Sequence, residues 1–518
     1  MSEAHYKIAL KKGVDKAQIV DELTRDTTSD DSVDSNVIPD RQVQFVDERK
    51  SSKRIVEMAL TPAEVVKLRA DNRIGDIEFP LTWSDDWLDY EINPRTSWAR
   101  NSTSITRNNW GLLRHIEETN GWGTNHTDTR SSTNFTGHLD GTGVDYVHQE
   151  GAIPRPDHEY LDDANGTSRM QTFQWNTLPN CSSAGTMYYT TNADGDHATH
   201  CCGTAVGKGI GWATNATLYF CDLSALSQAY WFDSIKEFHK AKTIDPVTGV
   251  KRPTVVSASW GYKSTFTSIT DIVFRGSSTG TTTKSASYGM IGDTSSRFNA
   301  AIYSLQAEVE EMQDEGVIYC KSAGNQYQKL CYSDDIDYNN YITKSVASGN
   351  ISAGNPIYYN RGAGNIGPDT IVVGNLDDDY NAGYAGTGSQ NGEYTAGSSD
   401  KGPRVDVWAA GTNIVSGGTS SSTHYYSTSG TSMSTPQIAG MACLLLQANP
   451  GMTPAQVRAW FQNNAKTGLM NQGPTDESDP ATFFGNNFGL MNGTNRIAYF
   501  PFSAHRPLTS TVSGNISF

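Results

Sequence analysis

The segment 430–446, GTSMSTPQIAGMACLLL, constrains the fold more than any other part of this chain. Its apolar residues recur at the spacing of a buried helix, and the Gly-Thr pair marks the start of that helix. Ser432 is then expected in the first turn, where free backbone N–H groups and the helix dipole favour a developing negative charge. This position suits a nucleophile for acyl transfer, although a serine that only caps a core helix would show the same local pattern.

From about residue 110 the sequence alternates strand and helix patterns. This alternation predicts an α/β fold with a doubly wound, mostly parallel sheet, whose functional groups gather at the carboxyl ends of the strands. The Gly/Ser/Thr-rich stretches 276–287 and 383–399 are interpreted as surface loops. The expected strands are 217–222, 254–258 and 317–320. Three helices are expected: the first covers 226–242, and the second has an apolar stripe of Phe298, Ile302, Leu305 and Val309. The third begins after the capping residue Thr453.

Residues 5–80 have a compact α+β pattern of their own. A capping box, Thr61-Pro-Ala-Glu64, predicts one of its helices. The other expected elements are strands at 6–10, 42–46, 54–60 and 74–79 and a helix at 15–23.

Four regions follow from these patterns. A small domain is expected over 1–82, and a polar linker that is open to proteolysis over 83–108. A large domain is expected over 109–466. A C-terminal extension over 467–518 either docks elsewhere or covers a sheet edge.

Composition limits the partners of the chain. The net charge of −16 argues against a nucleic-acid partner, which would require clustered Lys and Arg. No segment is long and apolar enough to predict a membrane span, and the start, MSEAHYKIALKKG, lacks the apolar core of a secretory signal. These features favour a cytoplasmic or virion-associated location over conventional secretion. Seven cysteines, an odd number, fit a reducing compartment.

Two motifs carry a family resemblance. The segment GTSMSTPQIAG resembles the nucleophile segment GTSMA[ST]PHVAG of the subtilisin-like serine proteases (subtilases), with changes that leave the reacting Ser432 in place. Residues 196–204, DHATHCCGT, resemble the subtilase motif HGTHVAGT, which implies that His197 is the catalytic base and that His200 is a packed residue. The alternative is that His197, His200 and Cys201 hold a metal ion.

A third motif and a substrate-binding segment follow. Residues 317–325, VIYCKSAGN, resemble the family's AAGN segment, which implies that Asn325 and the Ser432 backbone N–H stabilise the oxyanion. Residues 257–261, SASWG, resemble the segment that pairs with the substrate backbone. The resemblance assigns substrate binding to Ser259, Trp260, Gly261, Ala323 and Gly324.

The triad acid departs from the family pattern. Residues 141–153, GTGVDYVHQEGAI, resemble the strand G-x-G-V-x-V-x-V-x-D-[ST]-G-I, and the position of the usual Asp falls on Glu150. Glutamate can fill this role in hydrolases. Asp145 is the rival, but it lies five residues earlier, which aims it at the opposite face of the strand. A weakened or inactive site is the third possibility.

The resemblance as a whole implies a serine endopeptidase made as a self-inhibited zymogen. Residues 1–82 would be a ferredoxin-like inhibitory propeptide, and the substrate would be a protein or peptide. No cofactor is required for the chemistry. Structural calcium is a further expectation, because the family commonly binds it and the clusters Asp334-Asp335-Asp337 and Asp377-Asp378-Asp379 offer oxygen ligands. The competing interpretation is an inactive relative that acts as a binding or particle-assembly protein.

Overall fold

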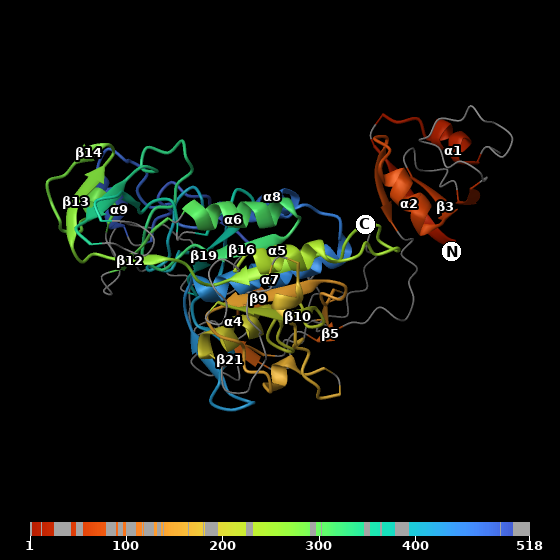
Figure 1. The fold of residues 1–518 in the computed structure, drawn as a ribbon, viewed down its shortest axis with the longest axis horizontal. Coiled ribbons are helices and arrows are strands. Elements are labelled where there is room, and N and C mark those ends of the chain that lie inside the picture. Colours follow the sequence, from red (N-terminus) through yellow and green to blue (C-terminus); the bar gives the residue numbers. More distant parts are fainter. Residues whose placement is uncertain are drawn as a thin grey trace. The chain divides into compact units, whose positions relative to one another are not determined.

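A computed structural model gives the fold of the chain, which divides into two compact units, Met1–Leu88 with Lys242–Arg252, and Asp89–Ala241 with Pro253–Phe518 (Figure 1). The residues described are 3–11, 13–24, 43–47, 55–78, 90–91, 97–99, 110–116, 118, 129–131, 136–137, 139–163, 165–179, 181, 195–223, 231–290, 297–301, 303–346, 353–362, 365–378, 393–486 and 488–500.

The first unit contains a four-stranded antiparallel sheet in the order β2-β3-β1-β4, with two helices. The predicted capping box is formed, because Thr61 Oγ1 accepts from Glu64 N while Glu64 Oε2 accepts from Thr61 N. Buried side chains from the strands and from α2 make a separate core. The elements are β1 (Ala4–Leu10), α1 (Lys16–Thr24), β2 (Gln44–Asp47), β3 (Ile55–Leu60), α2 (Pro62–Arg69) and β4 (Ile74–Glu78), which confirms the pattern predicted for this segment.

The second unit is built on an eight-stranded sheet in the order β10-β9-β11-β16-β19-β20-β24-β23. Neighbouring strands are parallel except β23, which runs antiparallel to β24. The strands are β9 (Asp145–Glu150), β10 (Thr217–Asp222), β11 (Thr254–Ala258), β16 (Ile318–Ser322), β19 (Ile371–Leu376), β20 (Val407–Ala410), β23 (Lys466–Thr467) and β24 (Arg496–Ile497). The predicted mostly parallel sheet is therefore confirmed.

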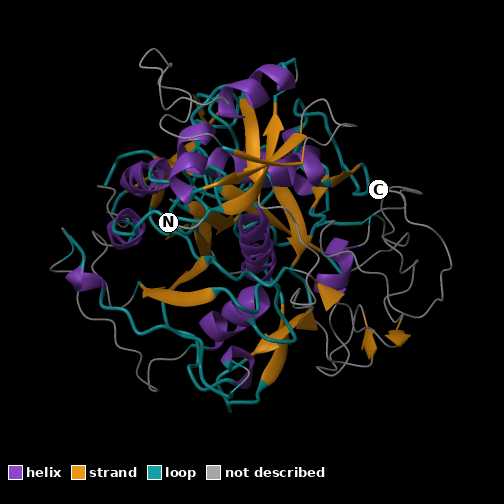
Figure 2. Cartoon of the chain, turned by 90° about the vertical axis from the view of Figure 1, so that its right-hand side faces the viewer, coloured by secondary structure: helices purple, strands orange, loops and turns teal. Residues whose placement is uncertain are grey.

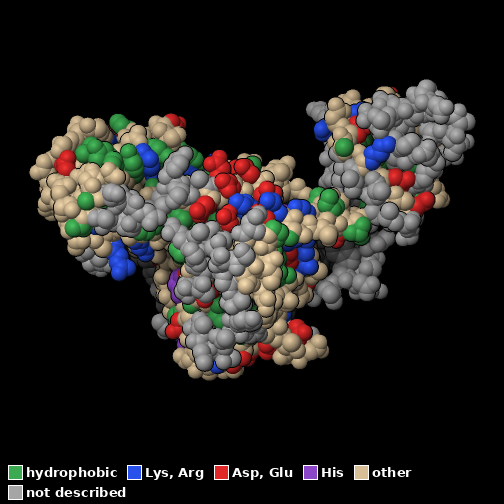
Figure 3. All heavy atoms as spheres, in the orientation of Figure 1, with side chains coloured by type: hydrophobic (Ala, Val, Ile, Leu, Met, Phe, Trp, Pro, Cys, Tyr) green, Lys and Arg blue, Asp and Glu red, His purple; other side chains and the backbone are tan. Residues whose placement is uncertain are grey.

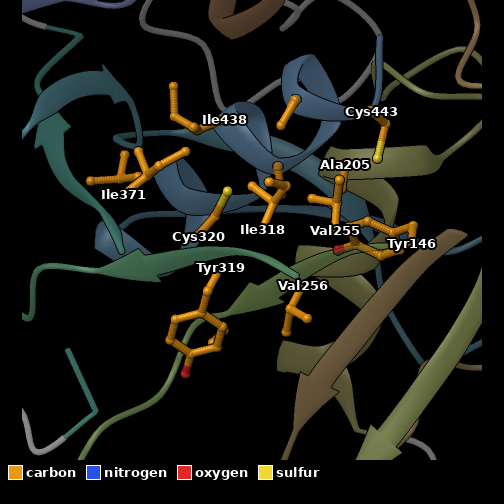
Figure 4. Packing of buried hydrophobic residues seen from close by; sticks show 14 of the residues in the cluster. Tyr146, Ala205, Val255, Val256, Ile318, Tyr319, Cys320, Ile371, Ile438 and Cys443 are labelled. Carbon is orange, nitrogen blue, oxygen red and sulfur yellow. The ribbon is translucent and has the colours of Figure 1, made fainter. Parts of the chain in front are cut away.

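Helices cover both faces of this sheet. The buried helix α7 (Thr431–Ala448) packs on β11, β16, β19 and β20 together with α4 (Asp196–Val206). Ile318 and Cys320 point toward α7, whereas Tyr319 points to the other face (Figure 4). There its ring meets Phe232, the residue before α5 (Asp233–Lys240). Figure 2 shows the chain turned by 90°, with helices in purple and strands in orange.

Charged side chains cover the outer surface of α5 and α6 (Tyr303–Asp314) (Figure 3). Lys236 of α5 contacts Glu311 of α6 at 2.8 Å, so an ion pair joins the two helices on their solvent side. The helix α8 (Pro454–Asn464) begins with the predicted capping box of Thr453 and Gln456. Among the described residues, no helix combines the length and the apolar character that crossing a membrane requires.

A second, smaller sheet was not predicted. Its order is β14-β13-β17-β18, and it has its own buried cluster that includes Ile272 and Ile342. It includes Ser277 and Ser278 of the stretch 276–287, where the sequence predicts a surface loop. The strands are β13 (Ile269–Phe274), β14 (Ser277–Ser278), β17 (Tyr341–Lys344) and β18 (Ile357–Tyr358).

Other segments also differ from expectation. Phe298 lies in β15 (Arg297–Asn299), which pairs with β12 (Lys263–Thr265), so the predicted helix begins only with α6. Ile302, residues 226–230 of the expected helix 226–242, and residues 379–392 and 501–518 lie outside the described residues.

The expected linker and C-terminal extension also contain strands. In 83–108 the described residues are the short strands β5 (Tyr90–Glu91) and β6 (Ser97–Ala99), which pair with β8 (Thr136–Gly137) and β7 (Thr129–Ser131). The expected extension contributes β24 and the last residue of β23 to the main sheet.

Candidate active site

The residues singled out in the sequence meet at the carboxyl edge of the main sheet. Glu150 is the last residue of β9, Ser259 follows β11, and Ala323 follows β16. These three strands are parallel neighbours, so their carboxyl ends lie side by side. The sheet topology therefore brings together segments that are far apart in the sequence, as expected for this class of fold.

Glu150 and His197 are in direct contact. His197 is the second residue of α4, and its Nδ1 lies 3.1 Å from Glu150 Oε2. The other carboxylate oxygen, Oε1, accepts from the Gly151 N–H at 3.4 Å. The side chain of Glu150 thus folds back toward its own backbone, which takes up the additional methylene of glutamate.

Asp145 lies at the opposite end of the same strand. It is the first residue of β9, and five residues of extended chain separate its backbone from that of Glu150 by about 16 Å. The structure therefore places Glu150, and not Asp145, beside His197.

The surroundings of His197 raise its pKa above the ordinary value. The largest contribution is the charge of the Cys201 thiolate, and the hydrogen bonds with Cys201 and Glu150 and the Glu150 charge add to it, while burial opposes them. The contribution of the Cys201 charge exists only when the thiol is ionised. The carboxylate of Glu150 therefore supports the imidazolium form at neutral pH.

Ser432 occupies the first turn of α7, as predicted. Gly430 precedes the helix with φ of 152°, a conformation that favours glycine. The Ser432 hydroxyl donates to the Ser259 carbonyl at 3.3 Å, and the described contacts include no hydrogen bond between this hydroxyl and His197. Rotation about the Cα–Cβ bond changes the acceptor, and catalytic hydrogen bonds often form only when substrate binds.

The backbone of Ser432 is held from two sides. Its carbonyl oxygen accepts from Ser259 Oγ at 3.0 Å and from Cys201 Sγ at 3.2 Å. These contacts connect the first turn of α7 to the segment after β11 and to α4, so the position of the nucleophile depends on three separate parts of the chain.

Asn325 is oriented by the residue before Ser432. Its Oδ1 accepts from both the N–H and the hydroxyl of Thr431, at 2.9 and 3.0 Å. The amide oxygen is therefore engaged, and the Nδ2 group remains as the donor. Gly324 has φ of 122°, and a Cβ there would collide with Asn299 and Asp400, so glycine is required in this turn.

The expected substrate-binding residues lie on the two segments that follow β11 and β16. Trp260 is half-buried, and its Nε1 donates to Gln149 Oε1 at 3.2 Å. Its ring meets that of Trp231 with centroids 5.2 Å apart. Ala323 is buried and its N–H donates to Val373 O at 2.9 Å.

The metal site predicted as an alternative, with His197, His200 and Cys201 as ligands, is not formed by these three residues. His200 is fully buried and its Nε2 lies 2.9 Å from the Ile414 carbonyl oxygen, so it does not join His197. Burial lowers the pKa of His200 to about 3. Instead, Glu150, His197 and Cys201 have donor atoms within 4.8 Å of one another. The sequence signal for this group was the spacing of His197 and Cys201, one helical turn apart.

An ammonium group fills the first acidic cluster. Lys329 Nζ lies 3.0 Å from carboxylate oxygens of Asp335, Asp337 and Glu477, and its side chain is fully buried. The Lys329 ammonium group thus neutralises these carboxylates. In the second cluster Asp378 accepts from Asn413 Nδ2 at 2.8 Å, and Asp379 lies outside the described residues. All seven cysteines are buried free thiols.

Comparison with known proteins agrees with these motifs. The chain is 35% identical over 131 residues to the serine protease AprX of Bacillus subtilis (strain 168), covering 20% of this chain and 28% of that protein. It is 36% identical over 126 residues to the M-protease of Shouchella clausii (strain KSM-K16), covering 24% and 28%. The matches thus span less than a third of these relatives.

Structure and family comparisons extend further along the chain. The crystal structure of a cold adapted subtilisin-like serine proteinase matches 77% of this chain and 99% of its own, with a TM-score of 0.42 and 18% identity. The description of the Subtilase family matches residues 124–486 of the 518. Because this match extends over most of the sequence, the chain belongs to the subtilase family.

Proposed function

We propose that the protein is a serine endopeptidase that cleaves proteins or peptides through an acyl-enzyme on Ser432. The observation that carries the proposal is the 3.1 Å contact between Glu150 Oε2 and His197 Nδ1 at the carboxyl edge of the sheet. A carboxylate in this position fixes the tautomer of the imidazole and stabilises its charged form. Subtilases need no cofactor for this chemistry.

Each group has one role in the reaction. His197 Nε2 takes the proton of the Ser432 hydroxyl while the oxygen attacks the substrate carbonyl, and it then gives the proton to the leaving amine. Asn325 Nδ2 and the Ser432 N–H donate to the oxyanion. Water then hydrolyses the acyl-enzyme by the same proton transfers, which restores the free hydroxyl.

The segments after β11 and β16 would bind the substrate backbone. Ser259, Trp260 and Gly261 continue one strand, and Ala323 and Gly324 continue its neighbour. An extended peptide between such segments gains affinity from main-chain hydrogen bonds, whatever its side chains.

The first unit would be a ferredoxin-like propeptide that inhibits the enzyme until it is cleaved. Its βαββαβ order and antiparallel sheet support this proposal. Self-cleavage within 83–108 would release the mature form. Ser432→Ala should then accumulate as the full-length chain, and its appearance at mature size without other proteases would refute cleavage by the protein itself.

A fluorophosphonate probe tests the function directly. The mature protein should be labelled at Ser432, and His197→Ala should abolish labelling while the thermal unfolding of the protein stays the same. An intact fold that takes no label would reject the protease and favour a binding or assembly role.

A further inference from the structure

Cys201 lies against the proposed catalytic histidine. It follows His197 by four residues in α4, so the two side chains share one face of the helix. Its Sγ is 3.9 Å from both ring nitrogens of His197, and the residue is fully buried. The family motif HGTHVAGT has valine at this position, so the thiol is a feature of this chain and not of the motif.

The three donor atoms lie close enough together to approach the dimensions of a small metal site. Bonds of 2.0–2.3 Å from zinc to nitrogen, oxygen and sulfur place tetrahedral ligands about 3.3–3.7 Å apart. In the structure Nδ1 of His197 is 3.1 Å from Glu150 Oε2 and 3.9 Å from Cys201 Sγ. These two distances are within about half an ångström of tetrahedral edges. The third pair, Glu150 and Cys201, has donor atoms within 4.8 Å of each other, so a movement of roughly 1 Å by one side chain would bring the set to zinc geometry.

The chemistry of the donors selects the ion. Imidazole and thiolate suit Zn²⁺, whereas Ca²⁺ and Mg²⁺ prefer oxygen ligands alone. The side chain of His197 is 46% exposed, which provides an access route from solvent and leaves room for water as a fourth ligand.

We propose that Glu150, His197 and Cys201 form a binding site for Zn²⁺ that inhibits the enzyme. Zinc takes the lone pair of Nδ1, so the proton of the neutral imidazole moves to Nε2, and the thiol proton leaves to solvent. An imidazole protonated at Nε2 cannot accept the proton of Ser432. Coordination of zinc by Glu150 also breaks the hydrogen bond between its carboxylate and the His197 ring. Binding depends on geometry alone, and the inhibitory effect rests on the proposed function.

Direct binding is tested in the full-length Ser432→Ala protein, which keeps all three ligands. Co²⁺ should produce a thiolate-to-cobalt charge-transfer absorption that Zn²⁺ abolishes by displacement. Adding Cys201→Val should remove this absorption. Cys202→Ala is the matched control, because the neighbouring Cys202 is also buried but interacts with Tyr160. Both substitutions restore residues of the family motif.

Inhibition is tested in the active enzyme. Zn²⁺ should inhibit reversibly on chelation, and Ca²⁺ and Mg²⁺ should not. Loss of an outer-shell partner already weakens metal sites about 10–100-fold, so Cys201→Val should raise the inhibitory zinc concentration at least about tenfold. Cys202→Ala should leave it unchanged.

The outcomes separate the two proposals. Equal zinc sensitivity of Cys201→Val, or cobalt binding without the thiolate absorption, would overturn the metal site. Absence of proteolysis in the metal-free wild type would reject the function, while the cobalt titration would still decide the site. If the valine variant fails to fold, as judged by thermal unfolding, Cys201→Ala replaces it in both measurements.

Discussion

Glu150 and His197 are 47 residues apart in the sequence, yet Oε2 of one and Nδ1 of the other lie 3.1 Å apart. The contact joins the last residue of β9 to the second residue of α4. Its geometry depends on the helix returning to the carboxyl edge of the strand, which is the arrangement that parallel sheets provide.

Replacement of Glu150 should show how much this contact contributes. An amide cannot stabilise the imidazolium and can favour the wrong tautomer, so Glu150→Gln should lower kcat by about 10³–10⁴-fold. Asp145→Asn, at the far end of the strand, should change kcat less than about tenfold. Both are measured with enzyme whose active sites have been titrated, and the opposite ranking would reassign the triad acid.

The pH profile should report the raised pKa of His197. The base must be neutral, so kcat/KM rises as the pH increases through this pKa, which is above its ordinary value of about 6.5. Glu150→Gln removes a charge and a hydrogen bond that raise the pKa. The rising limb should therefore move to lower pH in this variant. A limb that stays in place or moves to higher pH would contradict this assignment.

Asn325→Ala should act on the chemical step. Loss of one oxyanion donor should lower kcat by about 10²–10³-fold with little change in KM. Thr431→Val removes the hydroxyl donor to Asn325 Oδ1 but keeps the backbone donor, so its effect on kcat should stay below about tenfold. Steady-state kinetics on one peptide substrate measures both, and equal losses in the two variants would argue against a direct role of Nδ2.

Asp400 should affect stability in a pH-dependent way. Burial raises its pKa to about 6, although Oδ1 accepts from the N–H groups of Gln326 and Gln328. The folded chain thus binds this proton at higher pH than the unfolded chain. Protonation of Asp400 therefore raises the free energy of unfolding as the pH falls from about 6 to about 4. At neutral pH the buried Asp400 carboxylate is charged, which lowers the free energy of unfolding by about 3 kcal/mol.

Asp400→Asn should therefore unfold at the same or a higher urea concentration at pH 7. Its amide keeps the Oδ1 acceptor. Asn299 Nδ2 donates to Oδ2 of Asp400, so the Asn299 amide must turn over by 180° for its Oδ1, which has no partner in the described chain, to accept from the new Nδ2. Asp406→Asn is the control, because Arg404 and Arg458 pair with Asp406, and this substitution should destabilise. Urea unfolding in the Ser432→Ala background avoids self-digestion, and a large loss for Asp400→Asn would refute the prediction.

Local patterns were enough to predict much of the fold. The strands at 217–222 and 254–258 agree with the structure, and so do the capping boxes at Thr61 and Thr453. These features depend on residues a few positions apart, so periodicity and capping reveal them. The small sheet was missed because β13 pairs with β17, and nothing local in either strand identifies its partner.

The sequence by itself determined the motif residues, the alternation of elements and the substitution of glutamate at the acid position. Only the tertiary structure decided that Glu150 contacts His197, that Cys201 joins them, and that Lys329 fills an acidic cluster. The physical reason is that motifs and periodicity are set by neighbours along the chain. Contacts between side chains are set by strand order and helix packing, which bring distant segments together.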